Sequence, residues 1–133
     1  MKILQTLRRL EGETKVSQLD IDTEQLEDMQ NALGDAFPKL VQVTLLSLDK
    51  NKDKLGIAID NKDMQEAHMA SHSLGTSAGN LGLKGIYKTA RQIETIAYDQ
   101  LDAKECDFQE ILNLYALIQQ NFDETKQFLK SLL

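Results

Sequence analysis

Apolar side chains recur along most of the chain at spacings of three, four and seven residues, which is the period of amphipathic α-helices. The most regular stripe falls within residues 37–59 and comprises Phe37, Val41, Leu45, Leu48, Leu55 and Ile59. A second stripe starts near residue 83 and comprises Leu83, Ile86, Ala90, Ile93 and Ala97. A third lies nearer the C-terminus and comprises Phe108, Ile111, Leu112, Tyr115, Ile118, Phe122 and Leu129. This pattern predicts an all-α fold.

Residues that start or stop helices separate these stripes. Asp22 or Thr23 can cap a helix that reaches about residue 33, and Gly34 ends it. Pro38 fits the first turn of the following helix, where its missing N–H leaves no hydrogen bond unmade. The remaining breaks are polar or glycine-containing and lie at 60–61, 79–82 and 102–106. We therefore expect helices over about 23–33, 37–59, 63–78, 83–99 and 107–132.

Four long helices with short connections predict an antiparallel, up-and-down four-helix bundle. The segment before Phe37 is expected to pack over one end of this bundle as one or two additional short helices. At 133 residues the chain fits one domain. We assign residues 1–22 to an N-terminal amphipathic helix and linker, and residues 23–133 to the bundle.

Composition and charge narrow the possible partners. The formal net charge is −6 and no basic stripe is present, which argues against nucleic-acid binding. No run approaches the roughly 20 apolar residues that a membrane span needs, and the N-terminal stretch lacks the continuous apolar core of a signal peptide. Cys106 is the single cysteine, so no intrachain disulfide can form. These features predict a cytoplasmic protein without membrane association.

The helix expected over residues 63–78 carries both histidines of the chain. At roughly 100° per residue, the side chains that face the core are Met64, Ala67, Ala70, Ser71, Leu74 and Ala78. His72 falls about 150° from the centre of that cluster by the same helical geometry. It is therefore expected on the solvent side, together with Gln65, His68, Gly75, Thr76 and Gly79. The alternative is an ordinary surface histidine without a function.

Glycines near His72 favour a functional role. Gly75 and Gly79 lie one and two turns beyond it, and glycine within a helix costs about 1 kcal/mol relative to alanine. Such glycines are typical of places where another group approaches a helix closely. The alternative is a helix that merely tolerates a glycine.

Glu94 is a second feature in favour of a functional His72. A tight turn joins the two helices that carry these residues, so counting outward from it places His72 and Glu94 at the same level of an antiparallel pair. A carboxylate that accepts a hydrogen bond from one imidazole nitrogen leaves the other nitrogen free to act as a nucleophile. The alternative is a glutamate on a solvated helix face.

The run from residue 71 to 82, Ser-His-Ser-Leu-Gly-Thr-Ser-Ala-Gly-Asn-Leu-Gly, resembles the signature of histidine-containing phosphotransfer (HPt) domains. Leu74, the small residues after it and Leu81-Gly82 match that signature in spacing. Glu94 falls where the phosphotransfer domain of chemotaxis kinases, which the chain also resembles here, keeps a glutamate bonded to the phosphorylated histidine. The hydrophobic pattern from about residue 23 to 133 resembles the helix order of the family.

The resemblance implies a stand-alone phosphocarrier in a two-component phosphorelay. His72 would accept a phosphoryl group from the aspartate of a receiver domain, or from a kinase, and pass it to another receiver. Its partners would be response-regulator receiver domains and a hybrid sensor histidine kinase, docking on the face formed by His68, Met69, Gly75, Thr76 and Gly79. The carrier would need no cofactor, because Mg²⁺ resides on the receiver. It would be a monomer without kinase activity of its own, since no glycine-rich nucleotide motif is present.

Two positions depart from the family signature. The lysine expected three residues after the histidine is Gly75, and the glycine expected four residues after it is Thr76. Loss of that positive charge predicts slower transfer unless another cation replaces it. Antiparallel counting places Arg91 level with Gly75, where its guanidinium could reach a phosphate. Lys88 is a weaker candidate because it points further toward solvent.

Other interpretations stay open on the residues alone. One is a binding module that keeps the bundle, transfers phosphate poorly and acts by occupying a receiver or kinase. Another is a plain helical scaffold. A metal site shared by His68 and His72 is disfavoured, because two ligands are too few for a structural site and Cys106 lies on a distant loop.

Overall fold

The structure is a computed structural model that describes residues 19–133. In this range the chain forms α2 (Thr23–Leu33), a short 3₁₀ turn (Gly34–Ala36), α3 (Phe37–Asp60), α4 (Met64–Asn80), α5 (Lys84–Asp99) and α6 (Gln109–Lys130). The expected N-terminal helix falls mostly outside the described residues. The expectation of an all-α fold is confirmed.

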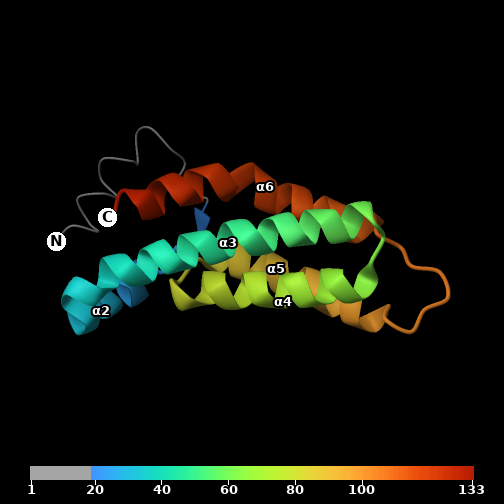
Figure 1. Ribbon diagram of the computed structural model, residues 1–133, viewed down its shortest axis with the longest axis horizontal. Coiled ribbons are helices and arrows are strands. Elements are labelled where there is room, and N and C mark those ends of the chain that lie inside the picture. The colour runs from blue at the N-terminus through green and yellow to red at the C-terminus, as the bar shows by residue number, and fades with distance from the viewer. Residues whose placement is uncertain (1–18) are drawn as a thin grey trace.

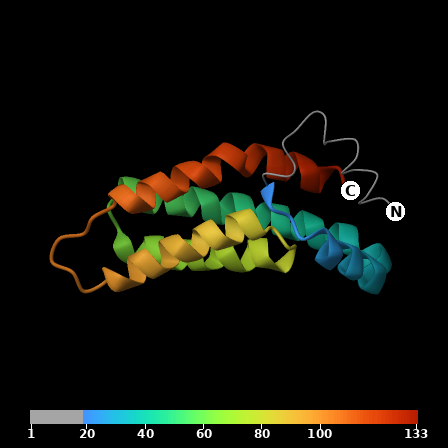
Figure 2. The ribbon, with the colours of Figure 1, turned by 180° about the vertical axis from the view of Figure 1, so that it is seen from behind.

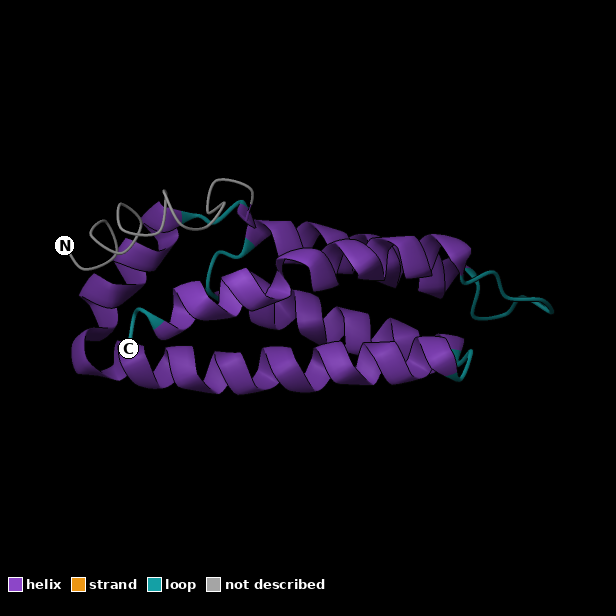
Figure 3. Ribbon diagram, turned by 90° about the horizontal axis from the view of Figure 1, so that it is seen from above, coloured by secondary structure: helices purple, strands orange, loops and turns teal. Residues whose placement is uncertain are grey.

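The four long helices run side by side in an antiparallel, up-and-down bundle (Figures 1 and 2). α4 packs mainly against α5 and α3, and α6 packs against α5 and α3. The short helix α2 lies at the end of the bundle where α3 begins (Figure 3). This arrangement agrees with the expected four-helix bundle covered at one end by a shorter segment.

Local signals start and end the first helices as expected. The Asp22 side chain caps α2 by accepting a hydrogen bond from the backbone N–H of Gln25 at 3.0 Å. Gly34 ends α2 with a φ of 54°, a left-handed value that glycine adopts without strain. Pro38 occupies the first turn of α3, where no hydrogen bond is lost.

The end of α4 differs from the sequence expectation. Gly79 and Asn80 remain helical, so the predicted turn at 79–82 began two residues too early. Gly82 is the glycine that stops the helix: its φ is 69°, and the N–H of Leu83 donates back to the carbonyl of Ala78 at 2.9 Å. This is the pattern of a Schellman cap, in which the left-handed residue follows the last helical turn.

Most of the expected core residues are buried between the helices, including every member of the stripes beginning at Phe37 and Leu83. One position in the C-terminal stripe was wrong: Leu112 is 47% exposed. The sequence expectation also omitted Phe128, which is completely buried. Ile111 already fills the core position of that turn, and its neighbour Leu112 projects about 100° away from it.

Candidate functional site

His72 lies on the outer face of α4. Its side chain is 58% exposed, whereas the six residues expected on the core side of this helix are all buried. The helical spacing therefore identified the core side of α4 and the exposed position of His72 correctly. An imidazole in this position is open to a large partner.

Glu94 of α5 stands directly beside the ring. Its Oε2 lies 2.6 Å from Nδ1 of His72, and its side chain is only 19% exposed. The two residues come together because α4 and α5 are antiparallel neighbours joined by a three-residue connection at 81–83. Counting outward from the turn thus predicted this contact.

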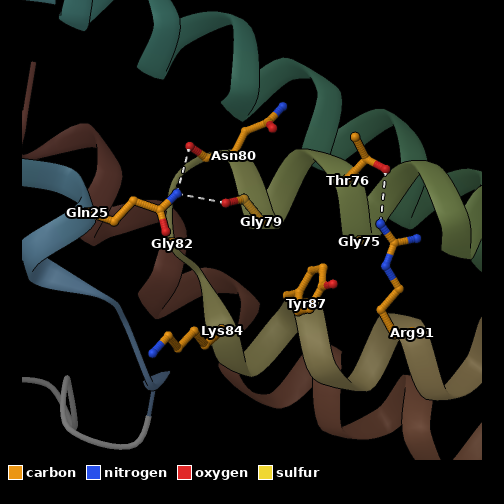
Figure 4. Close-up of a pocket in the computed structure, with 9 residues that line it drawn as sticks. All are labelled: Gln25, Gly75, Thr76, Gly79, Asn80, Gly82, Lys84, Tyr87 and Arg91. Atoms are coloured by element: carbon orange, nitrogen blue, oxygen red, sulfur yellow. Dashed lines mark hydrogen bonds between the residues drawn. The ribbon is translucent and has the colours of Figure 1, made fainter. Parts of the chain in front are cut away.

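Arg91, one turn before Glu94 on α5, completes the cluster. Its Nη1 donates to Oε1 of Glu94 at 2.6 Å, and its Nη2 donates to Oγ1 of Thr76 at 3.3 Å (Figure 4). The guanidinium crosses directly over Gly75, where an added Cβ would lie 3.3 Å from Cζ of Arg91. Gly75 is consequently buried beneath Arg91, and its assignment to the exposed docking face was wrong.

Tyr87 packs against Gly79 as Arg91 packs against Gly75. A Cβ on Gly79 would approach Cδ2 of Tyr87 to 3.1 Å, and Cζ of Arg91 lies 5.1 Å from the centroid of the Tyr87 ring. Figure 4 shows both side chains reaching from α5 toward the glycine-bearing face of α4. The close approach suggested by the glycines is therefore made by α5 of the same chain. Sequence reasoning gave Tyr87 no such role.

A cavity of about 410 Å³ lies beside Tyr87 and Arg91. Gln25 of α2 lines its far end, where the side-chain amide donates to the carbonyl of Gly79 at 2.9 Å (Figure 4). The segment before α2 adds a backbone hydrogen bond of 2.7 Å from Asp22 to the carbonyl of Gly82. The end of α4 is thereby held against α2 as well as α5.

Charge in the cluster determines which imidazole nitrogen carries the proton. Burial tends to raise the pKa of Glu94, but hydrogen bonds from Arg91 and His72 outweigh it, so this pKa is lowered. The hydrogen bond to Glu94 raises the pKa of Arg91, against the opposing effect of burial. Glu94 is thus an anion, and Nδ1 of His72 must donate to it.

This assignment explains a further contact and leaves the other nitrogen free. Nη1 of Arg91 lies 3.1 Å from Nδ1, but both atoms carry protons, so the pair is a contact without a hydrogen bond. Nε2 then holds the lone pair of the neutral ring. The arrangement presents an oriented nucleophile on the surface of the bundle.

Comparison with protein families gives one match: a family model described as Hpt domain covers residues 23–128. The chain belongs to the Hpt domain family. Searches of curated proteins and of solved structures gave no significant match. Hpt domains act in histidine phosphotransfer within two-component signalling, where they interact with receiver domains and kinases.

The remaining predicted residues of this Hpt domain lie around the cluster. Met69 is exposed, and His68 is half-buried with its ring 5.6 Å from that of Tyr98. Lys88 points away and pairs with Asp20 at 3.1 Å. Within residues 19–133 no group of three or more potential ligands is placed to hold a metal ion. No helix in that range has the length and apolarity to cross a membrane.

The lowered pKa of Glu94 in this Hpt domain predicts a pH-dependent contribution to stability. A carboxyl group whose pKa is lower in the folded than in the unfolded protein stabilises the fold at pH values above its unfolded pKa, here 4.5. This stabilisation is lost as the pH falls through the folded-state pKa. We expect Glu94→Gln to lower the free energy of unfolding by about 1–2 kcal/mol at pH 7. The difference from wild type should shrink progressively below pH 4.5.

Urea unfolding at several pH values measures this difference. Glu105→Gln, which removes a carboxylate from an exposed loop, is the matched control and should unfold like wild type at pH 7. If Glu94→Gln lowers the free energy of unfolding by the same amount at pH 7 and at the lowest pH tested, the carboxylate charge does not stabilise the fold.

Proposed function

We propose that this Hpt domain is a phosphocarrier whose His72 accepts a phosphoryl group and passes it on. The donor would be the aspartyl phosphate of a receiver domain, or a kinase, and the acceptor another receiver. The observation that carries the proposal is the 2.6 Å contact between Nδ1 and Glu94 on an open helix face. It leaves Nε2 as the reactive atom.

The proposed step moves one phosphoryl group between two carriers. The lone pair of Nε2 attacks phosphorus in line, a nitrogen–phosphorus bond forms, and the bond from phosphorus to the aspartate oxygen breaks. The receiver regains its carboxylate. The proton on Nδ1 stays in place, so positive charge develops on the ring opposite the Glu94 carboxylate. Mg²⁺ is expected on the receiver, where it neutralises charge on the phosphoryl oxygens.

We further propose a cytoplasmic monomer that meets its partners by diffusion. The exposed surface around His72, including His68, Met69 and Thr76, would form a modest interface, below about 1,200 Å² as in transient complexes. Phosphoryl exchange requires release of each partner, so tight binding would slow the relay. A hybrid sensor kinase and response regulators remain the proposed partners.

Transfer from a phosphorylated receiver tests this function. Wild-type protein incubated with a radiolabelled phosphoreceiver should acquire label that is labile in acid and stable in base, as a phosphoramidate is. Addition of a second receiver should then discharge it. Acid-stable label, or no label from any receiver or kinase, would contradict the proposal.

One observation supports a second candidate function. Gly75 stands where the family signature has a lysine, and loss of that charge would favour a binding module that occupies a receiver without efficient transfer. The same assay separates the two functions. Measurable binding of receivers without any label on the protein would favour the binding module.

Glu94→Gln is expected to slow transfer by about 10- to 100-fold, because the amide preserves the shape of the contact but not its charge. Developing positive charge on the ring would lose its neighbouring anion. Single-turnover labelling from a phosphoreceiver measures the rate, with Glu105→Gln as the control. A Glu94→Gln rate equal to wild type would exclude an electrostatic role for Glu94.

A further inference from the structure

A groove of about 630 Å³ runs between α3 and α4, on the side of His72 away from α5. Its lining includes Ser47, Lys50, Asn51 and Lys54 from α3, and His72 and Ser73 from α4. His72 therefore forms part of the wall of a depression that the Glu94 cluster does not occupy. Any group attached to the free edge of the imidazole would have this groove beside it.

The floor of the groove is polar. The hydroxyl groups of Ser47 and Ser77 are hydrogen-bonded at 2.6 Å, and Nδ2 of Asn51 donates to the carbonyl of Ser47 at 2.9 Å. The Ser47–Ser77 bond connects α3 to α4, and together with Asn51 it makes a hydrophilic base. The chemistry of the groove suits a charged, hydrated group better than an apolar ligand.

Two cations in the groove have no anionic partner. The side chains of Lys50 and Lys54 take part in no ion pair or hydrogen bond among residues 19–133. Three other lysines, Lys84, Lys88 and Lys126, are paired with carboxylates, Lys126 with Asp49 at 2.9 Å. The two ammonium groups are therefore available to an incoming anion.

The register of α3 against α4 places both lysines near His72. The Ser47–Ser77 pair sets residues 47 and 77 at the same level, so in antiparallel helices His72 is level with position 52. Lys50 and Lys54 then lie about 3 Å above and below it along the axis, at 1.5 Å per residue. Side chains lean toward the N-terminus of their own helix, which brings Lys54 closest to the level of the imidazole.

Arg91 lies beside the Nδ1 edge of the His72 ring and does not line the groove. Its guanidinium is 3.1 Å from Nδ1 and is committed to Glu94 and Thr76. A phosphoryl group would be carried by Nε2, across the ring from Nδ1. Arg91 is thus well placed to hold Glu94, whereas the positive charge of the groove is better placed for the phosphate.

We propose that Lys50 and Lys54 bind the phosphoryl group on His72, supplying from α3 the positive charge that Gly75 cannot supply from α4. This inference rests on the proposed function of His72. In the transfer step the nitrogen–phosphorus bond forms as the aspartyl oxygen–phosphorus bond breaks. The lysines exchange no proton and form only charge-assisted hydrogen bonds to the phosphoryl oxygens. Lys54 makes the larger contribution.

The double variant Lys50→Gln/Lys54→Gln tests this inference. Lys39→Gln/Lys104→Gln, which removes two exposed lysines elsewhere, controls for the change in net charge. Lys50→Arg/Lys54→Arg keeps the charge and should behave like wild type. We expect the glutamine pair to slow single-turnover transfer from a phosphoreceiver by about 10-fold, while both control proteins stay within about 2-fold of wild type.

A second measurement separates phosphate binding from receiver docking. The protein is phosphorylated chemically with phosphoramidate, without any receiver, and the ³¹P resonance of phosphohistidine is followed against pH. Nearby cations favour the dianion, so the resonance should titrate at lower pH in wild type than in the glutamine pair. Identical titrations would overturn the inference, even if transfer were slower.

The outcomes distinguish this inference from the proposed function. If wild type is labelled and Lys50→Gln/Lys54→Gln matches it in transfer rate and in titration, the role of the lysines is overturned and His72 remains the carrier. A shift in titration caused by Arg91→Gln but not by the lysine variants places the phosphate on the α5 side, and also overturns it. Absence of any label on wild-type His72 overturns the proposed function, and the role of the lysines with it.

Discussion

Replacing His72 by Gln is expected to abolish phosphoryl acceptance, lowering the transfer rate by at least about 1,000-fold. Glutamine can still donate a hydrogen bond to Glu94 through its amide. It has no nitrogen lone pair with the basicity of Nε2, so the nitrogen–phosphorus bond cannot form. The readout is acid-labile, base-stable label after incubation with a phosphoreceiver.

His68→Gln is the matched control, because it removes the other of the two histidines, one turn away on α4. It should retain acid-labile label. Because His72 is largely exposed and the glutamine amide can still donate to Glu94, the free energy of unfolding of His72→Gln should stay within about 0.5 kcal/mol of the wild-type value. If acid-labile label survived in His72→Gln and vanished in His68→Gln, the phosphoryl group would be carried by His68, and the assignment of His72 would be wrong.

The largest expected effect on stability belongs to Phe128. Its side chain is completely buried in the bundle, so Phe128→Ala should lower the free energy of unfolding by about 3–5 kcal/mol through lost apolar burial and the cavity left behind. Denaturant unfolding followed by circular dichroism measures the loss. Since small domains have only about 5–15 kcal/mol of stability, the variant should melt far below wild type.

Leu112→Ala on the same helix is the control. Leu112 is 47% exposed, and its truncation should cost less than about 1 kcal/mol. Comparable losses for the two variants would show that both faces of α6 are equally packed, contrary to the burial described here. The comparison also tests the one core position that the sequence pattern misassigned.

Local chemistry was enough to predict most helix boundaries. Asp22, Gly34 and Pro38 act through hydrogen bonds and backbone angles within a few residues of themselves, so their positions in the sequence carry the information. The end of α4 was misplaced because two glycines compete for it. Gly79 stays helical, and Gly82 adopts the left-handed conformation that closes the helix.

The contact between His72 and Glu94 was predictable for a similar reason. A tight turn forces adjacent helices to be antiparallel, and the 3.6-residue period then determines which side chains are level. The sequence alone therefore determined the exposed histidine and its carboxylate partner. Both follow from spacing measured along a short, continuous stretch of chain.

The tertiary structure decided how these faces are covered. A helical period identifies a solvent-facing or core-facing side, but not which neighbouring side chain lies over it. Gly75 became buried because Arg91 crosses it, and in α6 the core includes Phe128, whereas Leu112 is exposed. Lys50 and Lys54 came to flank His72 only through the packing of α3 on α4, which the Ser47–Ser77 contact holds in register. The exposure of His72 and its contact with Glu94 follow from the sequence. The side chain that covers Gly75 and the lysines beside the imidazole depend on how the helices pack together.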